Sequence, residues 1–292
     1  MRRVLVTGAT GFLGHYVIKE LLKNDVFEVV AIGGRPEDKV NTLPKHPKLQ
    51  LIPLEELFQH SFTDIETAIN CAFPRSNNAM LLAQALDFTE KLIKRFAELN
   101  VRSVINLSSQ GVYKRLPVGE LSTEDSPIEP IDQYSMAKYA SEKLFSISTV
   151  PYVTNVRLAS LMMPQRFLYL FVQKALGNEP FVVTAPNQYA SLLDATDAAS
   201  GLVALTLLAP KNRAEVYNLG LGAQYSLLEY AEGIRKIGCE FGYEVSFEVC
   251  DNESVVCAGM NCDKIKKHTG WKPVLFKDEM IRNLFIQLLY GQ

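Results

Sequence analysis

A tyrosine and a lysine four residues apart could carry acid–base chemistry in the middle of this 292-residue chain. Tyr134 and Lys138 lie in QYSMAKYASEK, where helical spacing places both side chains on one face, a turn apart. A phenol has a pKa of about 10 and is a poor base at neutral pH, but a neighbouring ammonium group lowers that pKa. Tyr134 could then remove or return the proton of a substrate hydroxyl, which a hydroxyl of Ser108 or Ser109 in NLSSQGVY could orient.

Three glycines near the start of the chain predict where a dinucleotide binds. Gly8, Gly11 and Gly14 follow an apolar run and precede a helix-periodic run in VLVTGATGFLGHYVIKELLKN. Such glycines allow a sharp turn, a close approach of the backbone to a pyrophosphate and tight packing of helix on strand. The amino end of the helix then offers free N–H groups to the phosphates. The residues expected to contact the cofactor here are Gly8, Thr10, Gly11, Phe12, Leu13 and Gly14.

The end of the second predicted strand bears on which dinucleotide is preferred. NAD-binding proteins usually carry an acidic residue there, about 20 residues on, for the ribose 2′-hydroxyl. This chain has Gly33 and Gly34 at that position, followed by Arg35. A guanidinium group can pair with a 2′-phosphate, so NAD(P) is the expected cofactor class and NADP the favoured member.

The elements that must position these residues alternate along the first half of the chain. Helical periodicity covers residues 15–24, 79–100 and 134–147, between apolar strand-like runs at 3–8, 28–33, 49–54, 67–73, 103–109 and 152–159. This alternation predicts an α/β fold, a Rossmann-type doubly wound parallel sheet with helices on both faces. Residues 1–160 are expected to form this dinucleotide-binding domain. Residues 161–292 should form mainly a smaller α+β substrate lobe, with some later segments returning to the sheet.

Composition limits the classes of function. The net charge of −2 gives no support to nucleic-acid or membrane-surface binding. Five cysteines form an odd number without metal-ligand spacing, which favours reduced thiols in a cytoplasmic protein and no bound metal.

Taken together, these motifs resemble the extended short-chain dehydrogenase/reductases, the NAD(P)-dependent epimerase/dehydratase group. TGATGFLG is similar to the family's cofactor loop, NLSSQGVY to its S-S-x-x-V-Y stretch and YSMAK to its Y-x-x-x-K. The resemblance implies that Ser109 is the catalytic serine beside Tyr134 and Lys138. It also implies nucleotide-sugar substrates, frequent homodimers through a helical interface, and a cofactor-lining segment, NCA, formed by Asn70, Cys71 and Ala72.

The chain departs from the family pattern where substrate phosphates are usually held. Ser160 stands where the family commonly has an asparagine that contacts the diphosphate. Ala190 stands where it commonly has an arginine, and no arginine occurs in CDNESVVCAGMN, where a second is often seen. Arg166 or Arg75 could substitute from new positions, so Ser160 and Arg166 are kept with Ser109 as candidate substrate contacts.

Three functions remain open from the sequence. The first is an NAD(P)-dependent epimerase or 4-keto reductase of a nucleotide-activated sugar, supported by Ser109, Tyr134 and Lys138. The second is a carbonyl reductase of a non-nucleotide small molecule, suggested by the missing arginines and the apolar run Leu161–Met163. The third is a non-catalytic protein that senses the cofactor or acts as a scaffold, since one fold can serve unrelated functions.

Overall fold

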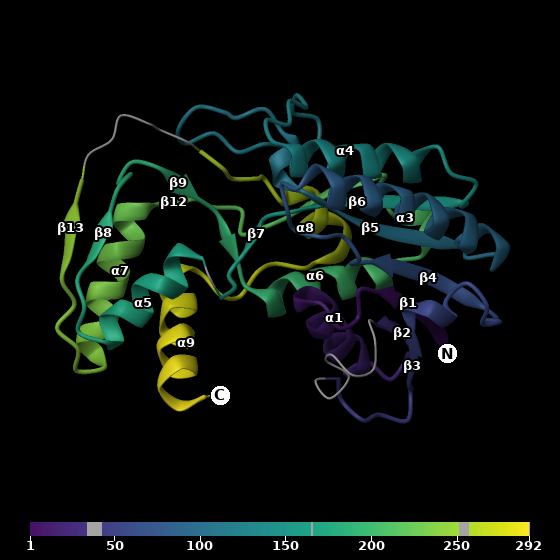
Figure 1. Ribbon diagram of the computed structural model, residues 1–292, viewed down its shortest axis with the longest axis horizontal. Coiled ribbons are helices and arrows are strands. Elements are labelled where there is room, and N and C mark those ends of the chain that lie inside the picture. The colour runs from purple at the N-terminus through teal and green to yellow at the C-terminus, as the bar shows by residue number, and fades with distance from the viewer. Residues whose placement is uncertain (34–42, 165, 251–256, 292) are drawn as a thin grey trace.

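A seven-stranded, wholly parallel sheet organises the larger part of the molecule (Figure 1). The computed structural model describes residues 1–33, 43–164, 166–250 and 257–291, so Arg35 lies outside the described residues. In spatial order the strands are β3 (Leu49–Pro53), β2 (Phe27–Gly33), β1 (Arg2–Thr7), β4 (Ile65–Asn70), β5 (Ser103–Ser109), β6 (Tyr152–Leu158) and β11 (Val216–Leu219).

The strand order reverses between β1 and β4, where Thr7 lies beside Asn70. Connections leave the two strands in opposite directions at such a point, which opens a crevice outside their carboxyl ends. The strands are near-continuous apolar runs because both faces of the sheet are covered. The predicted α/β class and doubly wound parallel sheet are confirmed.

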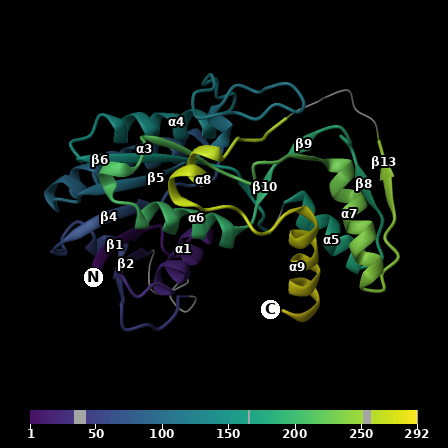
Figure 2. The ribbon, with the colours of Figure 1, turned by 180° about the vertical axis from the view of Figure 1, so that it is seen from behind.

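Helices from both halves of the chain cover the sheet (Figures 1 and 2). One face carries α3 (Ala79–Glu98) and α4 (Gln133–Ser146), where Phe96 and Phe145 are fully buried with Leu5 of the sheet. The other face carries α1 (Phe12–Leu22), α6 (Ala195–Leu207) and α8 (Asp263–Thr269). Short 3-10 helices connect other segments: η2 (Leu54–Glu56), η3 (Gln110–Val112) and η4 (Pro210–Asn212).

A buried row of asparagines crosses the sheet from β4 to β6. The Asn70 side-chain amide donates to Asn106 Oδ1 at 3.0 Å, and the Asn106 amide donates to Asn155 Oδ1 at 2.9 Å. Thr7 Oγ1 donates to Asn70 Oδ1 at 2.7 Å at one end, and Asn155 Nδ2 donates to Ser146 Oγ of α4 at 3.3 Å at the other. Since buried amides are costly without partners, the row sets strand register and links β1 to the helix that carries Tyr134.

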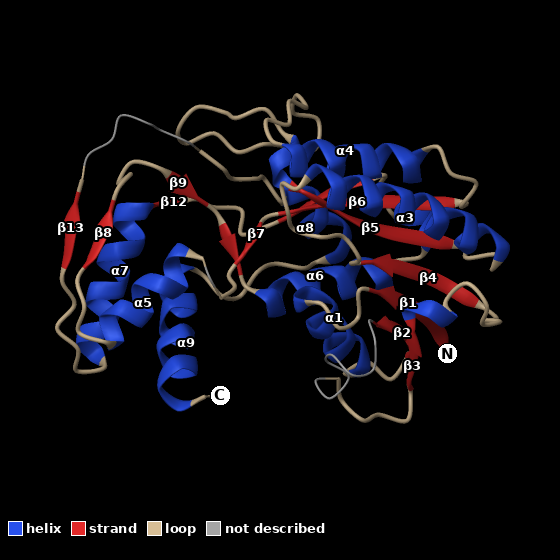
Figure 3. Cartoon of the chain, in the orientation of Figure 1, coloured by secondary structure: helices blue, strands red, loops and turns tan. Residues whose placement is uncertain are grey.

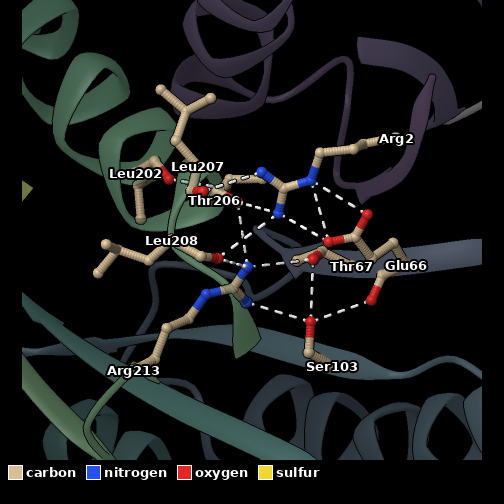
Figure 4. A network of polar contacts seen from close by, with 9 residues as sticks. All are labelled: Arg2, Glu66, Thr67, Ser103, Leu202, Thr206, Leu207, Leu208 and Arg213. Carbon is tan, nitrogen blue, oxygen red and sulfur yellow. Dashed lines mark hydrogen bonds and ion pairs between the residues drawn. The ribbon is translucent and has the colours of Figure 1, made fainter. Parts of the chain in front are cut away.

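A second polar network ties the end of α6 to the amino edge of the sheet (Figure 4). Arg213 donates to Ser103 Oγ at 3.1 Å and to the Thr206 carbonyl oxygen at 3.1 Å. Arg2 pairs with Glu66 at 2.7 Å and also donates to the Thr206 carbonyl oxygen at 2.6 Å. Guanidinium groups thereby satisfy carbonyls that α6 leaves free at its carboxyl end, and they fix this late helix on the sheet.

A smaller lobe has its own apolar core, formed by α5 (Phe167–Leu176), α7 (Leu227–Glu240), α9 (Lys277–Tyr290) and the pair β8 (Phe181–Val183) and β13 (Phe247–Val249) (Figure 3). Two-residue strands connect the parts: β7 (Ser160–Leu161) with β10 (Leu192–Leu193), and β9 (Tyr189–Ala190) with β12 (Tyr225–Ser226). Segments after residue 160 therefore pack in both cores. None of the described helices is both long and apolar enough for a bilayer span.

Candidate active site

The turn between β1 and α1 needs glycine at all three predicted positions. Gly8 has φ +68°, and a Cβ there would lie 2.8 Å from the Cys71 carbonyl carbon. A Cβ on Gly11 would lie 3.0 Å from the Gly8 carbonyl oxygen, and one on Gly14 would overlap that oxygen. Gly11 begins α1 without a side-chain cap, and the first turn has no acidic residue. This end of α1 is therefore a backbone cradle suited to a pyrophosphate.

A cavity of about 310 Å³ runs from this turn to the carboxyl ends of β5 and β6. Among the predicted site residues, it is lined by Gly8, Gly11, Phe12, Leu13, Gly14, Cys71, Ser109, Tyr134, Lys138, Ser160 and Arg166. A second cavity, of about 350 Å³, adjoins it and shares Ser160 and Arg166. The two together offer an elongated site with the glycine turn at one end.

Helix α4 places its tyrosine and lysine in the cavity wall. The Asp132 carboxylate caps the helix by accepting from the Ser135 backbone N–H at 2.7 Å. Lys138 is only 5% exposed and donates from Nζ to the Leu107 carbonyl oxygen at 2.7 Å. Its ammonium nitrogen also lies 4.2 Å from the ring centroid of Phe73 and 6.0 Å from that of Tyr134. The predicted four-residue spacing thus brings both side chains to the same cavity.

The sequence predicts that the Lys138 ammonium group lowers the pKa of Tyr134, but other charges have this effect in the structure. Burial lowers the pKa of Lys138 to about 7. Burial also raises the pKa of the Tyr134 phenol, and the positive charge of Arg75 is the largest effect that opposes this rise, ahead of Arg166. Guanidinium groups from other segments, rather than Lys138, supply the positive potential that favours the phenolate in the protein alone.

The two candidate serines have different surroundings. Ser109 Oγ accepts from the Gly111 backbone N–H at 3.1 Å and so caps η3. Ser108 Oγ is buried and has no hydrogen-bond partner among the described residues. Both residues line the cavity, but the Ser108 hydroxyl oxygen is itself buried, whereas Ser109 Oγ keeps a lone pair for a bound ligand.

Three of the predicted cofactor contacts that the structure describes do not line the cavity. Asn70 is 2% exposed and belongs to the asparagine row, where its Oδ1 also accepts from the Ala72 backbone N–H at 3.3 Å. Ala72 and Thr10 are not among the lining residues; Ala72 lies beside Gly8, and Thr10 lies beside Gly33. Arg35 lies outside the described residues.

The cavity also contains apolar residues, of which the sequence analysis had identified the run Leu161–Met163 but not Phe73. Phe73 lies against Lys138 and faces Tyr134 with ring centroids 6.3 Å apart. Leu161 and Met163 line the cavity, whereas Met162 between them packs against the core of the smaller lobe. In an extended chain, side chains point alternately to opposite sides, so Leu161 and Met163 could be expected to face one side together and Met162 the other. Among the described residues, no cluster of His, Cys, Asp or Glu could hold a metal ion.

Comparisons with known proteins support the family and the fold. The family model described as NAD dependent epimerase/dehydratase family matches residues 4–220. A UDP-glucose 4-epimerase of Lactobacillus helveticus is 24% identical, with 93% of this chain and 92% of that protein covered. A sterol-4-alpha-carboxylate 3-dehydrogenase of Dictyostelium discoideum is 26% identical, with 69% and 66% covered. The crystal structure of UDP-glucuronic acid 4-epimerase from Bacillus cereus, in complex with UDP-glucuronic acid and NAD, superposes with a TM-score of 0.81 at 19% identity, over 99% of this chain and 100% of that one.

Proposed function

The chain belongs to the NAD dependent epimerase/dehydratase family, and on that premise we propose that it is an epimerase or 4-keto reductase acting on a nucleotide sugar. The observation that carries this proposal is the placement of Tyr134, Lys138 and Ser109 on one cavity whose far end is the glycine turn. A UDP-sugar is the substrate class named for several relatives, including the Lactobacillus epimerase.

The glycine turn and the amino end of α1 suit the pyrophosphate of NAD, because glycine lets the turn pack against Cys71 and lets the helix pack against Gly8, and the helix begins without a side-chain cap on its backbone N–H groups. NAD, when bound, supplies hydride transfer at its nicotinamide ring. Tyr134 takes the proton of the reacting sugar hydroxyl on its phenolate oxygen and returns it to the ketone oxygen in the reverse step. Ser109 would orient that oxygen, and Lys138, which is held in the cavity wall by its bond to the Leu107 carbonyl oxygen, would contact the bound cofactor.

NAD is the cofactor we propose, because it is bound in the Bacillus cereus relative. A preference for NADP rested on Arg35 and stays a prediction, tested by comparing the affinities of the two cofactors with and without Arg35→Ala. An epimerase retains its cofactor through turnover, whereas a reductase releases it. The mass of any nucleotide that co-purifies with the protein therefore separates these two reactions.

Replacing Tyr134 by Phe tests the proposal. Removing a general acid–base group should lower turnover of a UDP-sugar by roughly 10²–10⁴-fold. Affinity for NAD should change less than about threefold, because the ring and its packing against Phe73 remain. Tyr139→Phe is the matched control, since Tyr139 lies on the same helix, does not line the cavity and should leave turnover unchanged. Full activity in Tyr134→Phe would refute the mechanism.

A second candidate function is reduction of a non-nucleotide carbonyl compound. The apolar cavity residues Phe73, Leu161 and Met163 favour it, as does Ala190 in place of a phosphate-binding arginine. The match to the Dictyostelium sterol dehydrogenase also favours it, because the name of that protein gives a substrate that is not a nucleotide sugar. Melting temperatures of the NAD-loaded protein with UDP-glucose, UDP-glucuronate and UDP distinguish the two, because only ligands that bind the folded state raise them. Stabilisation by none of the three would favour the second function.

A further inference from the structure

The short segment between β4 and α3 places an aromatic ring in the wall of the candidate active site. Phe73 lines that cavity together with Tyr134 and Lys138. Its ring centroid lies 4.2 Å from Lys138 Nζ. The ring also meets that of Tyr134 edge to face, with centroids 6.3 Å apart and planes inclined by 70°. Phe73 therefore lies against both side chains of the helix pair on which the proposed chemistry depends.

Hydrogen bonds on both sides of Phe73 fix the segment that carries the ring. The Phe73 backbone N–H donates to the Cys71 carbonyl oxygen at 3.1 Å. Asn77 Oδ1 accepts from the Tyr134 backbone N–H at 3.2 Å, which ties the segment to the first turn of α4. Asn78 Oδ1 caps α3 through bonds of 3.0 and 3.1 Å from its first backbone N–H groups. The backbone thus holds the ring against α4.

Lys138 is a buried cation that no carboxylate contacts in the described chain. It is 5% exposed, and its described hydrogen bond goes to the uncharged Leu107 carbonyl oxygen. The Glu142 carboxylate acts on it from the same helix, but both oxygens of that carboxylate are held by Arg157, at 3.0 and 2.9 Å. A buried ammonium group is costly without compensating partners. The face of Phe73 supplies negative potential on another side of this group.

The other described lysines that face an aromatic ring are placed differently. Lys143 Nζ lies 4.9 Å from a tyrosine ring on the exposed side of α4. Lys277 Nζ lies 5.7 Å from a ring and pairs with the Asp278 carboxylate at 2.6 Å. Among these described contacts, that of Lys138 with Phe73 is both the shortest and the most deeply buried. A cation–π contact contributes most where water is excluded, so this one should matter more than the others.

We propose that Phe73 is a positioning residue, whose ring face keeps the Lys138 ammonium group charged and fixed in the cavity wall beside Tyr134. The inference rests on the proposed function and deepens it, because Lys138 would contact the bound cofactor in that same site. A ring that attracts an ammonium group favours the charged form over the neutral amine.

The other titratable groups of this cavity keep one charge state near neutral pH. Burial lowers the pKa of Lys138 to about 7, and Cys71 and Glu142 oppose this effect. Burial raises the pKa of the Cys71 thiol to about 12 and also raises that of the phenol on α4. Arg75 and Arg166 line the same cavity and carry guanidinium groups, which stay charged. Lys138 is therefore the group of this wall that changes charge between pH 6 and pH 9.

Fluorinated phenylalanines in place of Phe73 test the inference in the cofactor-free protein. Mono-, tri- and pentafluorophenylalanine keep the shape of the ring, while fluorine progressively removes the negative potential of its face. The pKa of Lys138 is followed by NMR of ¹³C-labelled lysine, in which Lys138→Met identifies the signal. It should fall stepwise from about 7, by about one unit in Phe73→pentafluorophenylalanine.

The same amino acids in place of Phe58 are the matched control. The Phe58 ring is 41% exposed, packs edge-on against that of Phe88 and has no described cation over its face. These variants should leave the pKa of Lys138 unchanged. An unchanged pKa of Lys138 in all the Phe73 variants would overturn the inference.

Calorimetric titration with NAD provides a second readout. A pKa that falls from about 7 to about 6 lowers the charged fraction of Lys138 about fivefold at pH 7 and less than about twofold at pH 6. An ammonium group binds the hydroxyl and phosphate oxygens of the cofactor better than a neutral amine does. NAD should therefore bind up to about fivefold more weakly to the pentafluoro variant at pH 7, with a smaller loss at pH 6.

Equal losses of NAD affinity at both pH values would indicate a packing defect alone and would contradict the inference. Tighter NAD binding in the pentafluoro variant would show that the ring obstructs the site, and would contradict it too. Neither titration contains a sugar substrate, so these failures would leave the Tyr134→Phe test of the proposed function intact. If no UDP-sugar were turned over, a stepwise fall in the pKa of Lys138 would still support the role of Phe73.

Discussion

Replacing Lys138 by Met should alter how the stability of the protein depends on pH. Burial lowers the pKa of Lys138 from its ordinary value of 10.5 to about 7, because the ammonium group loses its water at 5% exposure. In the unfolded chain the lysine regains its ordinary pKa. Between these two values the unfolded state binds more protons than the folded state, so the free energy of unfolding should rise with pH.

The magnitude follows from the two pKa values. Integrating proton binding for one group with pKa values of about 7 and 10.5 gives a gain of about 2 kcal/mol in the free energy of unfolding between pH 7 and pH 9. The Cys71 thiol, which faces the lysine, stays uncharged over this window because burial raises its pKa to about 12. Lys138→Met keeps most of the aliphatic volume but removes the titration, so the variant should lack this gain.

Urea unfolding of the cofactor-free protein at pH 7, 8 and 9 measures the effect as a difference between wild type and variant, in which other titrating groups cancel. Lys143→Met, on the exposed side of the same helix, should follow the wild type. If wild type and Lys138→Met gained the same stability between pH 7 and pH 9, burial would not lower the pKa of Lys138, and the prediction would be wrong.

Two further predictions concern the cradle and the network in Figure 4. Gly14→Ala should lower both the melting temperature and the affinity for NAD, since the added methyl group would overlap the Gly8 carbonyl oxygen. Gly177→Ala is the control and should change neither, because its Cβ would meet nothing closer than 3.5 Å. An unchanged affinity for NAD in Gly14→Ala would contradict the assignment of the glycine turn as the cofactor site. Arg213→Met should lower the free energy of unfolding by about 2–4 kcal/mol, because it leaves buried oxygens at the end of α6 without donors; a urea midpoint equal to that of the wild type would show that the network contributes nothing.

The local motifs of the chain were readable because neighbouring residues encode them. Positive φ and close backbone approach demand glycine, so Gly8, Gly11 and Gly14 identified the turn wherever the rest of the chain went. Helical period placed Tyr134 and Lys138 on one face, and apolar runs separated by helices predicted the parallel sheet that is found. A parallel sheet then brings the ends of β4, β5 and β6 to one edge, which is why Cys71 and Ser109 lie on the same cavity.

Only the tertiary structure decided which charges act at that edge. The pKa of Tyr134 depends on burial and on the charges of Arg75 and Arg166, which come from segments far apart in the chain and line the same cavity as the phenol. Spacing along the sequence carries no information about such distances, and a pKa depends on local desolvation and on charges within a few ångströms. The sequence by itself therefore determined the turn, the helix pair and the sheet, whereas the positive site beside the phenol exists only because distant segments line one cavity.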